Sequence, residues 1–321
     1  MNPAFSVVFF TTLAGAAQGL VVALALAVLG GVTMSAGFLA RGLLFAAVLL
    51  VVGLAASFLH LGRPERAWRA AMMWRTSWLS REVIALPAFT GLVLVWWLAL
   101  RIDGEGVLAR RLLPLAAIVM AALLWYCTAM IYACLRFIEE WAQPLTVVNF
   151  TLIGLSSGFV LASALAAIGE ERAFLAWCGP AALVVTLVAW ALRMQAVRRN
   201  SVLRHRSTLQ TATGVRSPLL TQKSMGMSAG SFNTREFFHH ASLAAMRRVR
   251  LAVNVLAFAA PAAAMALAMA VSMSTAMSSL LPVAPLWLLA VLLQAPGLVA
   301  DRWYFFAQAK HPQNLYYQVV S

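Results

Sequence analysis

A histidine and a glutamate, both able to exchange protons, flank one arginine-rich stretch of this chain. His60 begins the run HLGRP, and Glu82 ends the run RTSWLSRE. Histidine titrates near neutral pH, and desolvation at an apolar boundary moves a glutamate toward its neutral form. Reduction of a quinone consumes two protons and oxidation of a quinol releases two, so this pair suits quinone chemistry. The spacing also fits a structural role, with His60 bonded to a backbone carbonyl and Glu82 facing a helix dipole or pairing with Arg63 or Arg81.

Long apolar segments lie on both sides of this pair. The chain has 321 residues and is 63% hydrophobic and 11% charged, whereas soluble domains are roughly 45–50% apolar. Runs of about 20 apolar residues cross a bilayer as helices. The sequence therefore predicts an all-α integral membrane protein, a bundle of eight transmembrane helices in which residues 1–321 form a single membrane anchor domain. The predicted spans lie at about 7–30, 39–60, 83–101, 112–135, 147–168, 173–196, 251–272 and 282–300.

Basic residues divide unequally between the two sides of this predicted bundle. The chain has 24 Lys and Arg, and all but five lie on the side that carries both termini and the segment from His60 to Glu82. By the positive-inside rule, we predict a multi-pass protein of the bacterial inner (cytoplasmic) membrane with both termini in the cytoplasm. Much of the excess lies in one long loop, close to the upper length for which the rule works. The five on the other side are Arg41, Arg101, Arg110, Arg111 and Arg172.

That long basic loop, residues 197–250 between helices six and seven, is the largest polar segment. Its basic residues alternate with aromatic ones, as in FNTREFFHH, unlike a disordered linker. We predict a cytoplasmic docking loop, and contact with anionic membrane lipid is the alternative. The net charge of +14 follows from this sidedness, so we predict no nucleic-acid partner.

The positions of histidine and cysteine argue against a resident metal group. No histidine lies in the middle of a predicted span, which argues against a b-type haem. Cys127, Cys134 and Cys178 form no C-x-x-C pair, which argues against an iron–sulfur cluster or another metal site in this chain.

A transporter is the alternative class of membrane protein. The predicted spans hold almost no ionisable residues, the sequence has no convincing inverted repeat, and Pro261 lies near a predicted helix end. All three observations disfavour a proton pump or an ion-coupled transporter. Gly15 and Gly19 have small-xxx-small spacing in the first helix, which predicts close approach of another helix.

Several motifs together resemble a known family. HLGRP and RTSWLSRE, with YACLRFIEEW, STLQTATG, GSFNTREFFHH and RWYFFAQAKHPQNLYYQ, resemble the membrane anchor subunit of dimethyl sulfoxide reductase-type molybdoenzymes. The opening NPAFSVVFFTTLAGAAQG and the FNTREFF segment are most similar to the anchor of cytoplasmic-facing sulfite dehydrogenase, a sulfite:quinone oxidoreductase. The likeness extends over most of the chain.

The resemblance implies an anchor subunit without a catalytic metal. It would belong to an oxidoreductase complex that takes part in electron transport, for example in anaerobic respiration. A subunit with four iron–sulfur clusters would sit on the anchor, and a molybdopterin catalytic subunit would sit on that partner. The bound substrate would be a quinone, ubiquinone or menaquinone. The family's quinone-site histidine and glutamate correspond to His60 and Glu82, and Arg63 and Arg81 are candidates for binding the headgroup.

The expected function is electron transfer between the iron–sulfur partner and the quinone pool in a sulfite-oxidising complex. Within the same class, the alternative is a quinol-oxidising anchor of a dimethyl sulfoxide reductase or another S- or N-oxide reductase. A purely structural anchor that has lost its quinone site would not need to retain both His60 and Glu82.

Overall fold

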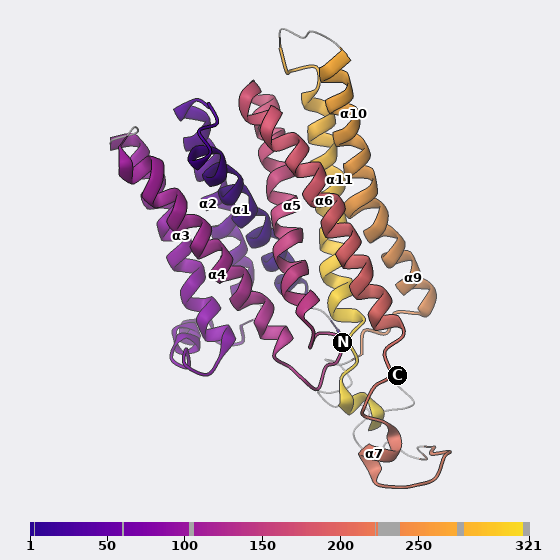
Figure 1. The fold of residues 1–321 in the computed structure, drawn as a ribbon. Coiled ribbons are helices and arrows are strands. Elements are labelled where there is room, and N and C mark those ends of the chain that lie inside the picture. Colours follow the sequence, from indigo (N-terminus) through magenta and orange to yellow (C-terminus); the bar gives the residue numbers. More distant parts are fainter. Residues whose placement is uncertain are drawn as a thin grey trace.

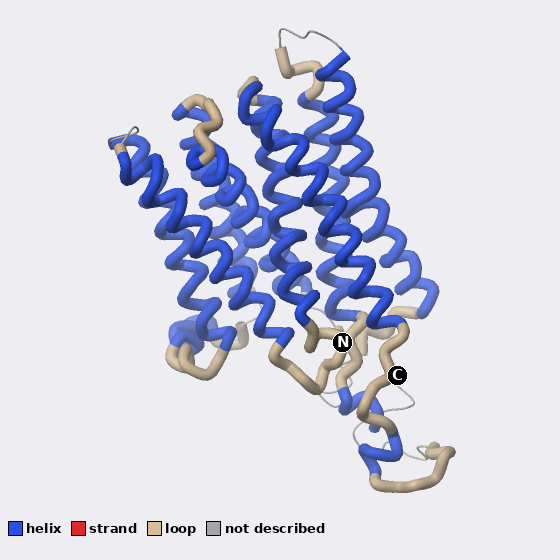
Figure 2. The backbone as a smooth tube through the Cα atoms, in the orientation of Figure 1, coloured by secondary structure: helices blue, strands red, loops and turns tan. Residues whose placement is uncertain are grey.

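The computed structural model describes residues 1–2, 4–59, 61–102, 106–221, 223, 238–274 and 279–316. His60 therefore lies outside the described residues. Helices and loops, without a strand, make up these described ranges (Figure 2). Eight helical spans among them are long and apolar enough to cross a membrane (Figure 1). The predicted all-α bundle of eight spans is confirmed.

The first six spans are single helices apart from a π-helical first turn, η2, before α4, and the seventh has three parts. The spans are α1 (Phe5–Leu29), α2 (Ala36–Phe58), α3 (Trp78–Ile102), η2 (Leu108–Leu112) with α4 (Leu113–Ala133), α5 (Pro144–Ile168), α6 (Arg172–Ser201), α9 (Leu243–Ala252) with η4 (Val253–Ala259) and α10 (Ala260–Ser274), and α11 (Ala284–Ala307). Three short helices lie between or after them: η1 (Pro64–Ala71), α7 (Leu209–Thr213) and η5 (Pro312–Tyr316).

Several helices continue past the apolar runs that predicted them. α6 extends to Ser201, α9 begins at Leu243, and α11 extends to Ala307. The segment 197–250 thus begins and ends as helix, and its residues 222 and 224–237 lie outside the described part of the chain. The extension of α11 also places Asp301 and Arg302 inside a helix, whereas the sequence suggested that they follow it.

Pro261 lies well inside the seventh span and not near its end. The span runs from Leu243 to Met273, because a basic turn at its start is helical as well. Proline has no N–H to donate and obstructs the preceding turn of an α-helix. The π-helical turn η4 directly precedes Pro261, at the place where the backbone must adjust its hydrogen bonds.

α1 and α5 pack against each other in the middle of the bundle, between α2, α3 and α4 on one side and α6, α10 and α11 on the other (Figure 1). Their backbones meet at glycines. A Cβ atom on Gly19 would lie 2.1 Å from the Gly154 carbonyl oxygen, and one on Gly158 would lie 2.0 Å from the Gly19 carbonyl carbon. The predicted close approach at the first helix is confirmed. It occurs at Gly19, since a Cβ on Gly15 would lie 3.6 Å from Gly154.

One end of the bundle collects the connections that the sequence assigned to one membrane side. η1, the loop 134–143 and α7 all lie at this end, where the N-terminus also lies (Figure 1). The backbone N of Met1 donates a hydrogen bond to the Ala309 carbonyl at 3.0 Å. We refer to this end, defined by η1, loop 134–143 and α7, as the η1 end.

Candidate functional site

Glu82 lies about one turn inside α3 at the η1 end. The helix begins at Trp78, and the hydroxyl of Ser77 accepts a hydrogen bond from the backbone N–H of Ser80 at 3.3 Å. This start turns Glu82 toward the bundle, where its side chain is only 5% exposed. Thr128 of α4 donates a hydrogen bond to the Glu82 carboxylate. A buried carboxyl group requires such a partner, because its unbonded burial is costly.

The two candidate arginines do not pair with this carboxylate. Arg81 donates from Nε to the Trp74 carbonyl at 2.9 Å and from Nη2 to the Arg75 carbonyl at 2.8 Å. Its guanidinium also lies 4.1 Å from the centre of the Trp78 ring. Arg63 is exposed just before η1. Within the described residues, therefore, Glu82 is bonded to a threonine and not to Arg63 or Arg81, and Arg81 holds the loop before α3.

The connection between α2 and α3 presents an apolar and cationic surface. Trp68, Met72, Met73 and Trp74 are all exposed there. The Arg69 guanidinium lies 5.5 Å from the Trp68 ring centre, and that of Arg75 lies 5.5 Å from the Trp74 ring centre. Exposed aromatic residues interleaved with arginines are typical of interfaces with proteins or lipid headgroups.

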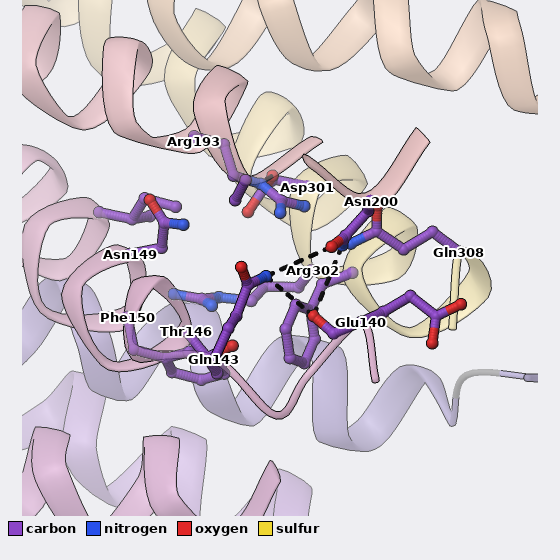
Figure 3. A pocket seen from close by; sticks show the side chains of 13 residues that line it. Glu140, Gln143, Thr146, Asn149, Phe150, Arg193, Asn200, Asp301, Arg302 and Gln308 are labelled. Carbon is purple, nitrogen blue, oxygen red and sulfur yellow. Dashed lines mark hydrogen bonds and ion pairs between the residues drawn. The ribbon is translucent and has the colours of Figure 1, made fainter. Parts of the chain in front are cut away.

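A second polar region lies deeper, between α5, α6 and α11 (Figure 3). Nε of Arg193 lies 2.5 Å from Oδ1 of Asp301, and both side chains are buried. The Arg302 guanidinium is also buried and lies 3.9 Å from the centre of the Phe150 ring. These charged residues lie within α6 and α11, near the helix ends that meet loop 134–143. Paired charges inside a helical bundle usually have a functional role.

Loop 134–143 binds the segments that follow α6 and α11. Nε2 of His205 lies 3.4 Å from a Glu140 carboxylate oxygen, and the backbone N–H of Lys310 donates to the same oxygen at 3.3 Å. Arg199 donates to the Glu139 carbonyl, and the Arg206 backbone donates to the Glu139 carboxylate, both at 2.8 Å. The paired glutamates of the YACLRFIEEW motif thus attach the beginning of the basic loop to the bundle.

The described end of that basic loop also returns to the bundle. Phe238 is buried, and the ring of His239 lies 5.9 Å from the Trp303 ring of α11. Burial lowers the pKa of the His239 imidazole. The two ends of the loop are thus fixed to the η1 end.

The sequence interpretation missed the polar partners of Glu82 and the buried charge cluster. Thr128 is one polar residue in an apolar helix, and only the rotation of α4 brings it to α3. Arg193 and Asp301 did carry a signal, because opposite charges at the ends of two apolar runs are tolerated in a membrane when they pair.

Comparison with known proteins agrees with this architecture. Residues 1–291 match the family described as DMSO reductase anchor subunit (DmsC). The chain is 46% identical over 337 aligned positions to a sulfite dehydrogenase subunit of Allochromatium vinosum, and the alignment covers 100% of both chains. It is 30% identical over 125 residues to anaerobic dimethyl sulfoxide reductase chain YnfH of Escherichia coli, which covers 39% of this chain and 44% of that relative. This chain, with its eight apolar spans, belongs to the DMSO reductase anchor subunit family.

Proposed function

We propose that this chain is the quinone-reactive anchor of a sulfite-oxidising complex in the bacterial inner membrane. The observation that carries the proposal is the Glu82 carboxyl group, buried within a membrane span and bonded to Thr128 of the neighbouring helix. Burial of a carboxyl group in an apolar span is costly, and ionisable residues kept in such spans usually serve a function. Next to a quinone, it can exchange the proton that accompanies electron transfer.

The chemistry balances between two sites. Oxidation of sulfite with one water gives sulfate, two electrons and two protons at the molybdopterin subunit. The electrons pass through a partner with four iron–sulfur clusters to a ubiquinone or menaquinone bound at this anchor. The quinone takes up two electrons and two protons to form the quinol. Glu82 and His60 exchange these protons with the quinone. Arg63 and Arg81 lie on the side of the site that faces the quinone headgroup.

The η1 end is the surface that suits the iron–sulfur partner. It carries the exposed Trp68, Met73 and Trp74 beside arginines, together with the two fixed ends of the basic loop 197–250. Electrons must reach a quinone near Glu82, so a cluster-bearing partner has to sit at the same end of the bundle. The charge distribution favours the cytoplasm for this end.

Glu82→Gln in the assembled complex is expected to lower quinone-linked sulfite oxidation about 100-fold. The amide keeps the size of the side chain and a bond to Thr128 but cannot take up or release a proton. Turnover with an artificial electron acceptor that bypasses the quinone is expected to stay at the wild-type rate. His60→Gln is expected to behave in the same way. Both rates are measured on the same purified preparation.

Glu170→Gln is the matched control, because Glu170 is exposed in the connection between α5 and α6, at the end of the bundle opposite the η1 end. It is expected to retain both rates. If Glu82→Gln assembles normally and keeps its quinone-linked rate, Glu82 is not the proton-exchanging group. If the chain purifies without any iron–sulfur protein, it is not an anchor of the proposed kind.

The orientation has a separate test. A cysteine replacing Met73, in a background with Cys134→Ser and in cells without the partner subunits, is expected to react with a membrane-impermeant maleimide only after the inner membrane is opened. Met73 is exposed in the connection between α2 and α3. A second cysteine in place of Val107, exposed at the opposite end of the bundle, is expected to react in intact spheroplasts. The reverse pattern would place the η1 end and its partners in the periplasm.

The opposite direction of electron flow, quinol oxidation for an S- or N-oxide reductase, is less well supported. The relative that carries such a name aligns with 39% of this chain, whereas the sulfite dehydrogenase subunit aligns with all of it. Sulfite-dependent quinone reduction by the purified complex distinguishes the two functions.

A further inference from the structure

Thr128, the partner of Glu82, also lines a small cavity inside the bundle. This inner cavity has a volume of about 10 Å³ and is lined by Gln18 of α1, Trp125 and Thr128 of α4, and Arg302 of α11, among others. Such a volume holds about one water molecule. The Glu82 carboxyl group is therefore one hydrogen bond away from a buried polar space.

Two residues that line the inner cavity carry buried polar atoms without a hydrogen-bond partner within the described ranges. Gln18 is 2% exposed, and neither its Oε1 nor the indole Nε1 of Trp125 has a partner among the described residues. One group accepts a hydrogen bond and the other donates one. Buried polar groups left in this way are satisfied by ordered water when the space admits it.

A second cavity adjoins the first. This outer cavity also has a volume of about 10 Å³, and it shares Phe150 and Arg302 with the inner cavity (Figure 3). Here Oδ1 of Asn149, Nη2 of Arg193 and Oε2 of Glu140 have no partner within the described part of the chain. Oδ1 of Asn149 can accept a hydrogen bond from a water in a space of this size, and Nη2 of Arg193 can donate one to it.

A carboxylate lies beside the arginines of the outer cavity. Arg193 pairs with Asp301, which directly precedes Arg302 in the sequence. The Asp301 carboxylate offsets part of the barrier that two buried arginines would present to a proton. The carboxyl group of Glu140, which also lines the cavity, points away from the two arginines (Figure 3).

The outer cavity ends at the surface of the η1 end. Glu140, which lines it, lies 3.4 Å from Nε2 of His205, whose side chain is 29% exposed. An imidazole can pass a proton between solvent and a neighbouring carboxyl group through its ring nitrogens. Polar residues thus line the two cavities between Glu82 and the η1 end. They are Thr128, Gln18, Arg302, Asn149 and Glu140, and Glu140 contacts the partly exposed His205.

We propose that these residues line a hydrated proton path that serves the quinone site. The inference rests on the proposed function and goes beyond it by naming the route of the protons. For each quinone reduced, the partner's iron–sulfur cluster supplies two electrons, and protons enter at His205 and Glu140. They move through the two cavities to Glu82 and then to the quinone oxygens. Quinol oxidation would use the same route outward.

The test replaces one polar residue of each cavity with leucine in the assembled complex. Gln18→Leu and Asn149→Leu are each expected to lower the quinone-linked kcat about tenfold and to raise its solvent deuterium isotope effect, with the KM for quinone unchanged. The double variant is expected to be no more than about twofold slower than the slower single variant, because both act on one path. Turnover with the artificial acceptor, measured on the same samples, reports the amount of assembled complex.

Gln294→Leu is the matched control. Gln294 is equally buried, donates to Ser156 at 2.9 Å, and is not among the residues that line either cavity. The path is wrong if Gln18→Leu and Asn149→Leu keep the wild-type kcat and isotope effect, or if Gln294→Leu loses as much. Glu82→Gln, measured in the same series, distinguishes failure of the proton path from failure of the proposed quinone site. Loss in Glu82→Gln alone overturns only the path, whereas full activity of Glu82→Gln overturns the quinone site itself.

Discussion

Asp301→Ala is expected to lower the free energy of unfolding by about 3–5 kcal/mol. The carboxylate lies 2.5 Å from the Arg193 guanidinium, and both side chains are almost fully buried. Removal of Asp301 leaves Arg193 charged and without a counterion while its side chain is buried among the helices. The second buried arginine, Arg302, directly follows residue 301 in the sequence. Its positive charge repels that of Arg193. Equilibrium unfolding of the purified protein in mixed micelles with increasing SDS measures the change.

The double variant Arg193→Met/Asp301→Leu is the control for this prediction. Replacing both members of a buried ion pair with apolar residues of similar size is often neutral or stabilising. We therefore expect the double variant to recover most of the stability lost in Asp301→Ala. Two results would show that the ion pair does not contribute this stability. One is an additive loss of unfolding free energy in the double variant, and the other is a change below about 1 kcal/mol in Asp301→Ala.

The sequence could predict some parts of the fold and not others, and the ion pair between Arg193 and Asp301 shows why. Apolar runs located all eight spans, because a bilayer requires about 20 apolar residues for each crossing. They did not locate the ends of α11 or the start of α9. Charged residues normally end a membrane helix, but Asp301 and Arg302 continue α11 because their partners come from α6 and α5. Contacts between distant helices do not appear in a local pattern.

The candidate site shows the same division. Residue type and spacing singled out Glu82, and the structure buries its side chain within a span, but its proton-exchanging role stays a prediction. The roles of His60, Arg63 and Arg81 stay predictions. Sequence could not show that Thr128 bonds to Glu82 or that Gln18 lines the next cavity, because both depend on how α1 and α4 are rotated within the bundle. Helix rotation is set by packing, and at α1 the packing is set by glycine.

Gly19→Ala is therefore expected to destabilise the protein by about 3 kcal/mol. The added methyl group would lie 2.1 Å from the Gly154 carbonyl oxygen and 2.9 Å from the Gly158 Cα atom. These are backbone atoms of α5, so a change of rotamer cannot relieve the overlap and the two central helices must separate. The neighbouring Gln18 moves with α1, so the quinone-linked rate is expected to fall as well. Unfolding in SDS and quinone-linked turnover are measured on the same preparation.

Gly15→Ala tests whether this effect comes from close packing or from the loss of a glycine. It is the same chemical change one turn earlier on the same helix, and its added methyl group would lie 3.6 Å from the Gly154 Cα atom, an ordinary contact. Alanine favours the helix by about 1 kcal/mol relative to glycine, so we expect Gly15→Ala to be neutral or slightly stabilising. Equal stability of the two variants would contradict the packing argument. A large loss of stability in Gly19→Ala alone would show that contact between α1 and α5 holds the two halves of the bundle together. The same contact would then fix the relative positions of the polar groups between Glu82 and Glu140.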